Sequence, residues 1–268
     1  MEIIEHIDEW REGIKRWQED HRGASTARED YPVVVNKHAP FVPLGRALSM
    51  LNLALVTSAG AYIDGTEAFD VQAPGGDTSF REIPTLIEAE DLIIAARGYD
   101  SAAVRRDINA QIPLDRLFEF EGNGIIGQLS PVFWSFCGFI PDAGRLVEES
   151  LPRFVERVKR YEVQGVLLVP ASRLCHQSMA LAARALELAK IPTMMLAVAR
   201  DVVDVVRPPR AAYYAGKFGS VAGEPEWPEH QRRVLDQSLR TLESLDQPDV
   251  YRLVVELETS VEISRGEQ

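Results

Sequence analysis

The residues best suited to chemistry lie between positions 165 and 177. This stretch opens with a short apolar run, flanked by Gly165 and Pro170, which predicts a strand buried on both faces. A polar turn follows, and from residue 178 apolar residues recur at helical spacing. Ligands of such strand–turn–helix units collect at the carboxyl end of the strand. Cys175 lies there, so we expect the chemistry at Cys175.

Two features predict a reactive thiol at Cys175. Unpaired amides and the helix dipole at a helix start favour a thiolate over a thiol. Arg173 adds a positive charge two residues away. We therefore expect the pKa of the Cys175 thiol to be lowered.

Ser172, His176 and Asp100 are the candidates for moving protons at this site. Ser172 lies in the turn, where its hydroxyl is expected to cap the helix by accepting a hydrogen bond from the amide of Leu174 or Cys175. His176 follows Cys175 directly, but neighbouring residues on a helix do not face each other. A surface role for His176 therefore stays open.

Cys137 is the other cysteine of the chain. Two cysteines are too few for a disulfide scaffold in 268 residues. It is either a buried apolar filler or a second thiol, provided that the fold brings it to Cys175. No close group of His, Cys, Asp and Glu has metal-ligand spacing. Residues 57–60 lack the glycine pattern of a dinucleotide site, so no cofactor is indicated.

Two arginines could hold a substrate carboxylate. Arg81 lies in a long polar stretch, residues 64–84, which is expected to be a loop, and Arg173 lies beside Cys175. Arg81 could equally be a surface arginine. Three further residues are candidates for substrate contacts: Ser58, Asp77 and Asn109.

The composition limits the classes of protein to which this chain can belong. With 268 residues, 46% of them apolar, the chain can bury a sizeable core. A net charge of −12 argues against a nucleic-acid partner. No run reaches the length of a membrane-spanning helix, and the N-terminus lacks the features of a signal peptide. We expect a cytoplasmic protein.

The apolar runs predict an α/β fold with a mostly parallel sheet, flanking helices and two halves that meet near residue 142. The expected division is an N-terminal amphipathic helix at 1–22, a first half at 40–142 and a second half at 143–268. The expected strands are 51–57, 91–96, 124–129, 165–170 and 191–198, with an edge strand at 251–263. The expected helices are 2–22, 114–121, 145–161, 178–190 and 228–245, with a link at 22–32 and an irregular connection at 207–219.

The N-terminal helix carries a narrow apolar stripe on a charged cylinder. Such a stripe either docks on the protein's own body or forms a seam with a second copy or a partner subunit. Its members are Ile3, Ile7, Trp10, Ile14 and Trp17.

From about Pro43 to Leu245 the chain resembles the selenoprotein B family of glycine, sarcosine, betaine and D-proline reductases, in its short form. The resemblance rests on several ordered motifs, at residues 54–60, 76–84, 107–117, 124–127, 165–177 and 207–210. It implies a reductase that uses an external thiol reductant.

In that family the central stretch carries a selenocysteine or cysteine nucleophile, a following proline and, further on, Cys–His. The second thiol resolves the first. Here Ser172 stands at the nucleophile position and Arg173 at the proline, while Cys175 and His176 match. A serine hydroxyl cannot form the internal S–Se or S–S pair that the family's reductive cleavage uses.

Three hypotheses about function follow. The first is a thiol-dependent, reductase-like enzyme that acts through Cys175 on a small amino-acid-like or N-substituted carboxylate, with Ser172 positioning and Cys175 reacting. The second is a non-catalytic subunit or binding protein derived from the reductases. The third is a racemase- or lyase-like enzyme that uses two thiols, Cys137 from the first half and Cys175 from the second.

Overall fold

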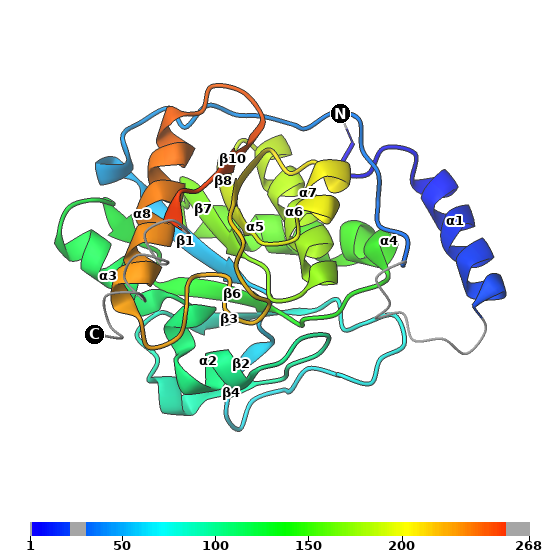
Figure 1. Ribbon diagram of the computed structural model, residues 1–268, viewed down its shortest axis with the longest axis horizontal. Helices are drawn as coiled ribbons and strands as arrows, with labels where there is room; N and C mark the ends of the chain where they lie inside the picture. Colours follow the sequence, from blue (N-terminus) through cyan, green and yellow to red (C-terminus); the bar gives the residue numbers. More distant parts are fainter. Residues whose placement is uncertain (1, 22–30, 256–268) are drawn as a thin grey trace, which may run out of the picture.

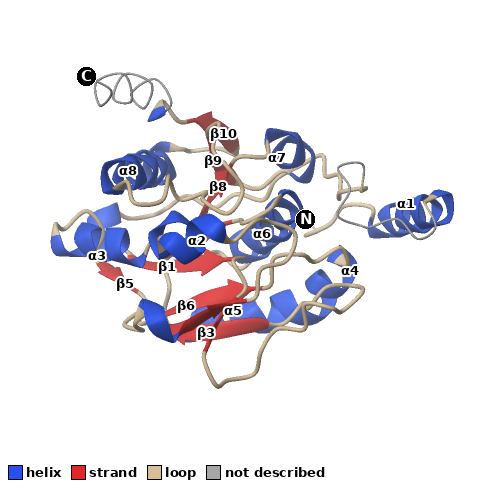
Figure 2. Cartoon of the chain, turned by 60° about the horizontal axis from the view of Figure 1, so that its bottom comes forward, coloured by secondary structure: helices blue, strands red, loops and turns tan. Residues whose placement is uncertain are grey.

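The centre of the protein is an eight-stranded sheet with strand order β10-β9-β8-β7-β1-β6-β3, in which β5 also pairs with β1 (Figures 1 and 2). The computed structural model describes residues 2–21 and 31–255. Each pair in the sheet is parallel except β3–β6, which is antiparallel. The strands are β1 (Asn52–Thr57), β3 (Phe80–Pro84), β5 (Gln128–Leu129), β6 (Val132–Phe136), β7 (Gly165–Val169), β8 (Thr193–Ala197), β9 (Arg210–Tyr213) and β10 (Asp249–Arg252).

Helices cover both faces of this sheet. Because alternate residues of a strand point to opposite faces, Leu53 and Leu55 of β1 pack on one side, and Ala54 and Val56 on the other. The first side is covered by α3 (Leu114–Gly122) and α8 (Pro228–Ser244). The second side is covered by α5 (Leu151–Arg160), α6 (Arg173–Leu188) and α7 (Arg200–Val206).

The expected α/β fold with a mostly parallel sheet is therefore confirmed. The runs at 51–57, 165–170 and 191–198 form β1, β7 and β8. Strands from both expected halves, 40–142 and 143–268, join in one sheet, because β1 pairs with β7 over five residues.

One expected strand lies outside the parallel sheet, and another is much shorter than expected. In the run 91–96 only β4 (Leu92–Ile94) is a strand, and it pairs antiparallel with β2 (Ala61–Ile63) outside the main sheet. In the run 124–129 only the last two residues are strand, because Gly124 turns the chain with a φ of +69°. The aromatic run at 132–136 supplies the strand β6 instead.

Two segments read as irregular also contain regular structure. The end of the predicted loop 64–84 is the edge strand β3, and β9 lies inside the predicted connection 207–219. The helix expected at 145–161 is α4 (Ala143–Arg145), a π-helical turn (Leu146–Ser150) and α5. The link at 22–32 and the edge strand at 251–263 lie largely outside the described residues, although β10 ends at Arg252.

The remaining elements are short, apart from α1 (Ile7–Asp20), which lies at the side of the body in Figure 1. Trp17 of α1 is buried, whereas Ile7, Trp10 and Ile14 are only partly covered. No helix of the described residues is long and apolar enough to cross a membrane. The short elements are α2 (Ala102–Arg106) and three 3-10 turns at Leu48–Met50, Ala89–Asp91 and Ile108–Ala110.

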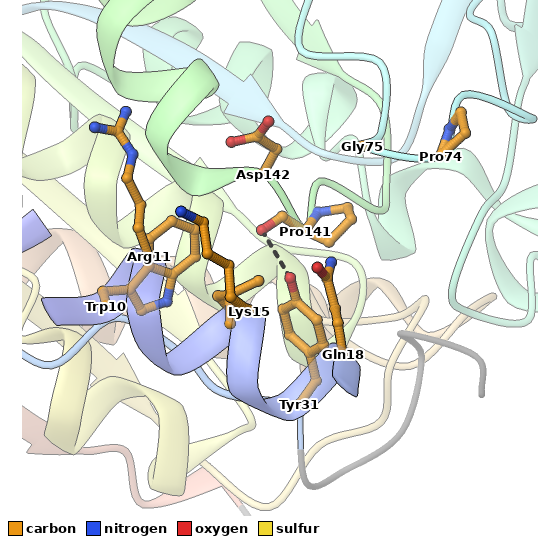
Figure 3. A pocket seen from close by; sticks show the side chains of 10 residues that line it. Trp10, Arg11, Lys15, Gln18, Tyr31, Pro74, Gly75, Pro141 and Asp142 are labelled. Atoms are coloured by element: carbon orange, nitrogen blue, oxygen red, sulfur yellow. Dashed lines mark hydrogen bonds between the residues drawn. The ribbon is translucent and has the colours of Figure 1, made fainter. Parts of the chain in front are cut away.

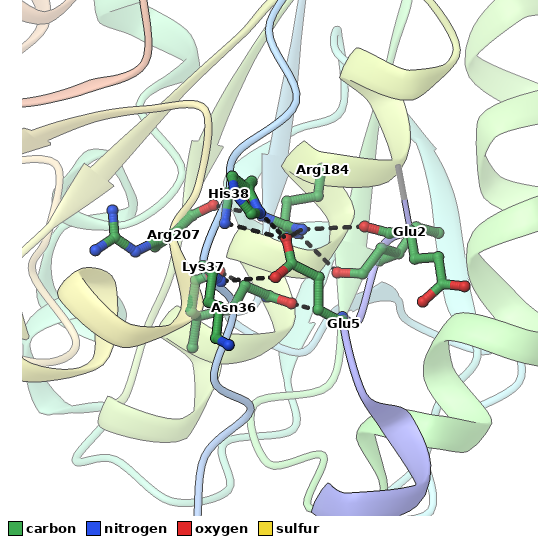
Figure 4. Close-up of polar contacts among 9 residues, drawn as sticks. Glu2, Glu5, Asn36, Lys37, His38, Arg184 and Arg207 are labelled. Atoms are coloured by element: carbon green, nitrogen blue, oxygen red, sulfur yellow. Dashed lines mark hydrogen bonds and ion pairs between the residues drawn. The ribbon is translucent and has the colours of Figure 1, made fainter.

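The chain before β1 is held along α6 by three buried polar side chains, which we call the strap anchors. Gln177 accepts a hydrogen bond from the amide of Val34, and Glu187 accepts one from the amide of Val42. Arg184 lies between them in sequence on the same face of α6, and Figure 4 shows its contacts with the chain before β1. The strap anchors therefore satisfy main-chain groups of an extended segment that has no strand partner of its own.

Arg184 is the central strap anchor and is fully buried. Its guanidinium donates to the carbonyl oxygens of Ile3, His38 and Arg207 at 2.6–2.9 Å and to that of Glu2 at 3.0 Å. These bonds tie the N-terminus to residues 182 positions away in sequence. Losing the guanidinium would leave four carbonyls short of a donor.

We predict that Arg184→Met lowers the free energy of unfolding by about 3 kcal/mol, because four carbonyl groups lose a charged donor in a buried place. The measurement is a urea titration of both proteins. The matched control is Arg153→Met on the exposed side of α5, which should change the value by less than about 0.5 kcal/mol. Equal losses in the two variants would contradict the anchoring role.

Candidate functional site

Cys175 lies at the point where the strand order of the sheet reverses. β1 has β6 on one side and β7 on the other, so the carboxyl ends of these three strands meet beside the start of α6. This is the place where open α/β sheets bind ligands. The Cys175 thiol is 1% exposed and donates a hydrogen bond to the carbonyl oxygen of Gly138.

Ser172 shares this carbonyl with Cys175. Its hydroxyl oxygen lies 3.0 Å from the Cys175 sulfur and 3.2 Å from the Gly138 oxygen. The same oxygen accepts the amide of Cys175 at 3.2 Å and so caps α6. The predicted cap is confirmed, and it explains why α6 begins at Arg173, five residues before the helix expected from residue 178.

Glycine is required at position 138. A Cβ there would lie 2.5 Å from the carbonyl oxygen of Arg97, closer than heavy atoms approach, and 3.3 Å from the ring of Tyr99. The main chain after β6 packs beside the start of α6. Its carbonyl oxygen can then reach both Ser172 and Cys175.

Cys137 lies on the other side of the same peptide segment. It is 1% exposed, and burial raises the pKa of its thiol to about 11, although the amides of Phe139 and Gly138 favour its thiolate. A charge on Cys175 raises the pKa of Cys137 further. Cys137 therefore lies close enough to Cys175 for its pKa to respond to the charge of that thiolate.

The expected lowering of the Cys175 pKa is wrong. Burial raises the pKa of the Cys175 thiol, and the Ser172 hydroxyl, the Ser58 hydroxyl and the helix-start amides offset that only in part. Arg173 does not face the sulfur as a free cation, because its guanidinium pairs with Asp201 at 2.7 Å. Desolvation of the thiolate outweighs the helix-start effect.

His176 is fully buried and held at both ring nitrogens. Nε2 accepts the amide of Val198 at 3.0 Å, so the ring is neutral with its proton on Nδ1, which donates to the Ser172 carbonyl oxygen at 2.6 Å. Burial lowers the pKa of His176 to about 4. The ring links the turn before α6 to the end of β8, and it makes no hydrogen bond to Cys175 among the described contacts.

Tyr99 is a neighbour of the thiols that the sequence reasoning did not single out. Its hydroxyl donates to the carbonyl oxygen of Ala59 at 2.7 Å, and burial together with the charges of both thiolates raises its pKa. Its ring lies against Gly138 and against Gly219 of the loop after β9. Its place directly after the predicted strand 91–96 was the available signal.

Of the predicted substrate contacts, the structure brings only Ser58 to the thiols. Its hydroxyl accepts the amide of Ala171 at 2.9 Å and favours the Cys175 thiolate. Arg81 donates to the carbonyls of Glu67 and Ala68 at 2.9 and 3.1 Å. Arg81 therefore fastens the loop before β3.

The other candidates also hold loops. Asp77 accepts the amides of Asp70 and Ser79, both at 2.9 Å. Asn109 exchanges two hydrogen bonds with Asp115. Asp100 is exposed and accepts the amide of Ala102 at the start of α2.

Gln111, which the sequence reasoning passed over, connects the carboxyl end of β7 to the loop after β9. Its fully buried amide donates to the Val169 carbonyl and accepts the amide of Val221, both at 3.2 Å. The 107–117 motif therefore holds this loop over the end of the sheet. Among the described residues no group of three or more His, Cys, Asp and Glu could hold a metal ion.

The fold and the site together define an α/β protein with a buried thiol pair at the switch point of a parallel sheet. Residues 26–171 match the family described as glycine/sarcosine/betaine reductase selenoprotein B, and the match ends one residue before Ser172. The chain belongs to this family.

The D-proline reductase subunit gamma of Acetoanaerobium sticklandii is 33% identical over 75% of this chain and 82% of its own length. The glycine reductase complex component B subunit gamma of Symbiobacterium thermophilum is 25% identical over 82% of this chain and 52% of its own. The sarcosine reductase complex component B subunit beta of Peptoclostridium acidaminophilum is 26% identical over 63% and 39%. This chain thus spans about half or less of the last two relatives. No solved structure matches.

We predict that the neutral, buried His176 makes stability depend on pH. Because its folded pKa of about 4 lies below the unfolded value near 6.5, the unfolded chain takes up a proton first as the pH falls. Between pH 7 and pH 4 the wild type should lose about 3 kcal/mol more unfolding free energy than His176→Gln. Urea titrations at several pH values measure this.

The matched control for that experiment is His6→Gln, an exposed histidine, which should keep the wild-type pH dependence. If His176→Gln retains it as well, His176 is not held neutral by the fold.

We predict that Cys175 is protected in the folded protein. Since its thiol is buried, hydrogen-bonded and raised in pKa, iodoacetamide at pH 8 should label it on the order of a hundredfold more slowly than in urea. Peptide mass spectrometry separates the labelling of Cys175 from that of Cys137. Labelling of native Cys175 at the urea rate would contradict the closed geometry.

Proposed function

We propose that the protein is a thiol-dependent, reductase-like enzyme that acts on a small amino-acid-like or N-substituted carboxylate through Cys175. Ser172 positions the thiol, and Cys137 serves as its partner thiol. The proposal extends the family membership to a particular site and reaction.

One observation carries this proposal: two thiols and a hydroxyl gather on the main chain at 137–139, where three strand ends meet. Cys175 and Ser172 both lie within hydrogen-bond distance of the Gly138 oxygen. Cys137 is the residue before Gly138, and its pKa responds to the charge on Cys175. A family member that lost its nucleophile at position 172 would thereby keep a second thiol beside Cys175.

A thiol pair can balance a two-electron reduction. Cys137 and Cys175 would join in a disulfide and release two electrons and two protons, while one bond of the substrate is cleaved and each fragment gains hydrogen. An external dithiol then restores both thiols by exchange. Cys175 must become accessible during this cycle, because it is 1% exposed in the closed state.

The substrate class is proposed from the relatives. D-proline, glycine and sarcosine, which the relatives are named for, are all small amino-acid carboxylates. Two of the relatives are named as components of complexes, so we propose that this chain also works with partner subunits. Arg173, on the first turn of α6 and 27% exposed, is the cation closest in sequence to Cys175. We propose it as the carboxylate contact, which requires its guanidinium to leave the ion pair with Asp201.

A second candidate is a non-catalytic subunit of such a complex. The observation that favours it is the saturated, buried state of Cys175, whose pKa is raised and whose thiol already donates to Gly138. In that case Ser172 and Cys175 serve only to fix the start of α6.

The test is consumption of glycine, sarcosine and D-proline by the full chain with excess dithiothreitol, followed by nuclear magnetic resonance. We predict that Cys175→Ser abolishes turnover, because the thiol is the reacting group, and that Ser172→Ala keeps it within about tenfold, because a lost cap and hydrogen bond cost little more than about 1 kcal/mol.

The opposite pattern would identify the Ser172 hydroxyl as the nucleophile. Turnover that survives both substitutions would place the chemistry at other residues, whereas its absence from the wild type favours the non-catalytic subunit. Ser172→Cys is the informative third variant. With the Ser172 oxygen 3.0 Å from the Cys175 sulfur, a thiol at position 172 should form a disulfide with Cys175 on oxidation.

A further inference from the structure

A hollow with charges of both signs lies between α1 and the body (Figure 3). It encloses about 390 Å³. Its walls combine aromatic and aliphatic side chains with charged ones: Trp10, Ile14, Tyr31, Pro74 and Pro141 on the apolar side, and Arg11, Lys15 and Asp142 among the polar ones.

The hollow has a positive wall on α1. Arg11 and Lys15 are one helical turn apart, so they project from the same side of the helix. Arg11 is already paired with Glu148 at 2.7 Å. Lys15 has no ion pair within the part of the chain that the structure describes, which leaves its ammonium group for a ligand.

The opposite wall carries a negative charge. Asp142 caps α4 by accepting the amide of Arg145 at 2.9 Å, and its carboxylate has no ion pair among the described residues. Its charge raises the pKa of Tyr31, whose hydroxyl donates to the Pro141 carbonyl. No ion pair within 4.0 Å joins Lys15 to Asp142, so both charges face the hollow across a gap.

We propose that this hollow binds a small zwitterion, with its carboxylate at Lys15 and its ammonium group at Asp142. A simple anion would leave Asp142 without a partner, and a simple cation would leave Lys15 without one. The rings of Trp10 and Tyr31, with Pro74 and Pro141, suit a compact apolar body between the two charges. A metal ion would find a single carboxylate there.

The hollow is separate from the thiols, but one apolar cluster contacts both. Tyr31 lines the hollow and also packs in the apolar cluster of Trp17, Phe139 and Leu174. Leu174 precedes Cys175, and Phe139 follows Gly138. A zwitterion bound in the hollow would therefore stabilise the packing of α1 on the segments that carry both thiols. The proposal rests on the lining of the hollow and does not depend on the chemistry at Cys175.

Calorimetric titration with three matched probes tests the proposal. Proline, in both enantiomers, carries both charges on a five-membered ring, while cyclopentanecarboxylate carries only the anion and pyrrolidine only the cation. We predict that at least one enantiomer of proline binds the full chain at least about tenfold more tightly than either single-charge probe, since each alone leaves one charge without a partner.

The variants assign the binding to this hollow. Lys15→Met and Asp142→Asn should each weaken proline at least about fivefold, and asparagine at position 142 still caps α4. The matched control on the same helix is Glu19→Gln, which lies outside the hollow and should bind as the wild type does. Circular dichroism confirms that each variant is folded, and Lys15→Arg, which keeps the charge, should retain binding.

Two results would overturn the zwitterion site: no binding of either enantiomer to the wild type at tens of millimolar, or equal binding to the wild type, Lys15→Met and Asp142→Asn. Cys175→Ser separates this proposal from the one about the thiols. That variant should bind proline as the wild type does, even where it has lost turnover.

Discussion

The carbonyl oxygen of Gly138 is the contact on which the arrangement of the site depends. It receives the Cys175 thiol and lies 3.2 Å from the Ser172 hydroxyl, and position 138 itself has no room for a side chain, because a Cβ there would lie 2.5 Å from the Arg97 carbonyl oxygen. β6 and β7 are both neighbours of β1, so the chain after each arrives at the same edge of the sheet.

The same contact explains why burial and reactivity oppose each other here. The amides at the start of α6 favour a thiolate, yet the packing that brings Gly138 under the helix also removes water from the sulfur. Desolvation is the larger effect, and the thiol stays protonated and bound to a carbonyl. A chemical role for Cys175 therefore requires an open state, whereas the closed state is a stable resting arrangement.

Much of the fold could be predicted from the sequence, because the apolar runs of β1, β7 and β8 are buried on both faces and read as continuous stretches. The failures have local causes. β3 is an edge strand of five residues ending at Pro84, and its mixed polar sequence carries no continuous apolar run. β9 follows two prolines, and two of its four residues are alanines, so its strand propensity is weak although its neighbours bury it.

The site could be predicted only in part. The motif placed Ser172 and Cys175 correctly at a strand–turn–helix junction, and the cap follows from residue type. The direction of the Cys175 pKa could not be foreseen, because it is set by burial of the thiol, which depends on how distant segments pack around the start of α6. Arg81 and Asn109 are polar residues within recognisable motifs, but their partners are loop groups that sequence spacing does not reveal.

The strap anchors have a consequence for how the chain is made. Residues 2 and 3 leave the ribosome well before Arg184, whose guanidinium holds them and which lies 182 positions after Glu2. At a translation rate of roughly 5–20 residues per second, the N-terminal segment waits roughly 10–40 seconds before its anchor exists. During that interval the segment has none of the contacts that α6 gives it later. Its charged composition, rather than any native contact, must keep it from associating with other chains until α6 has emerged.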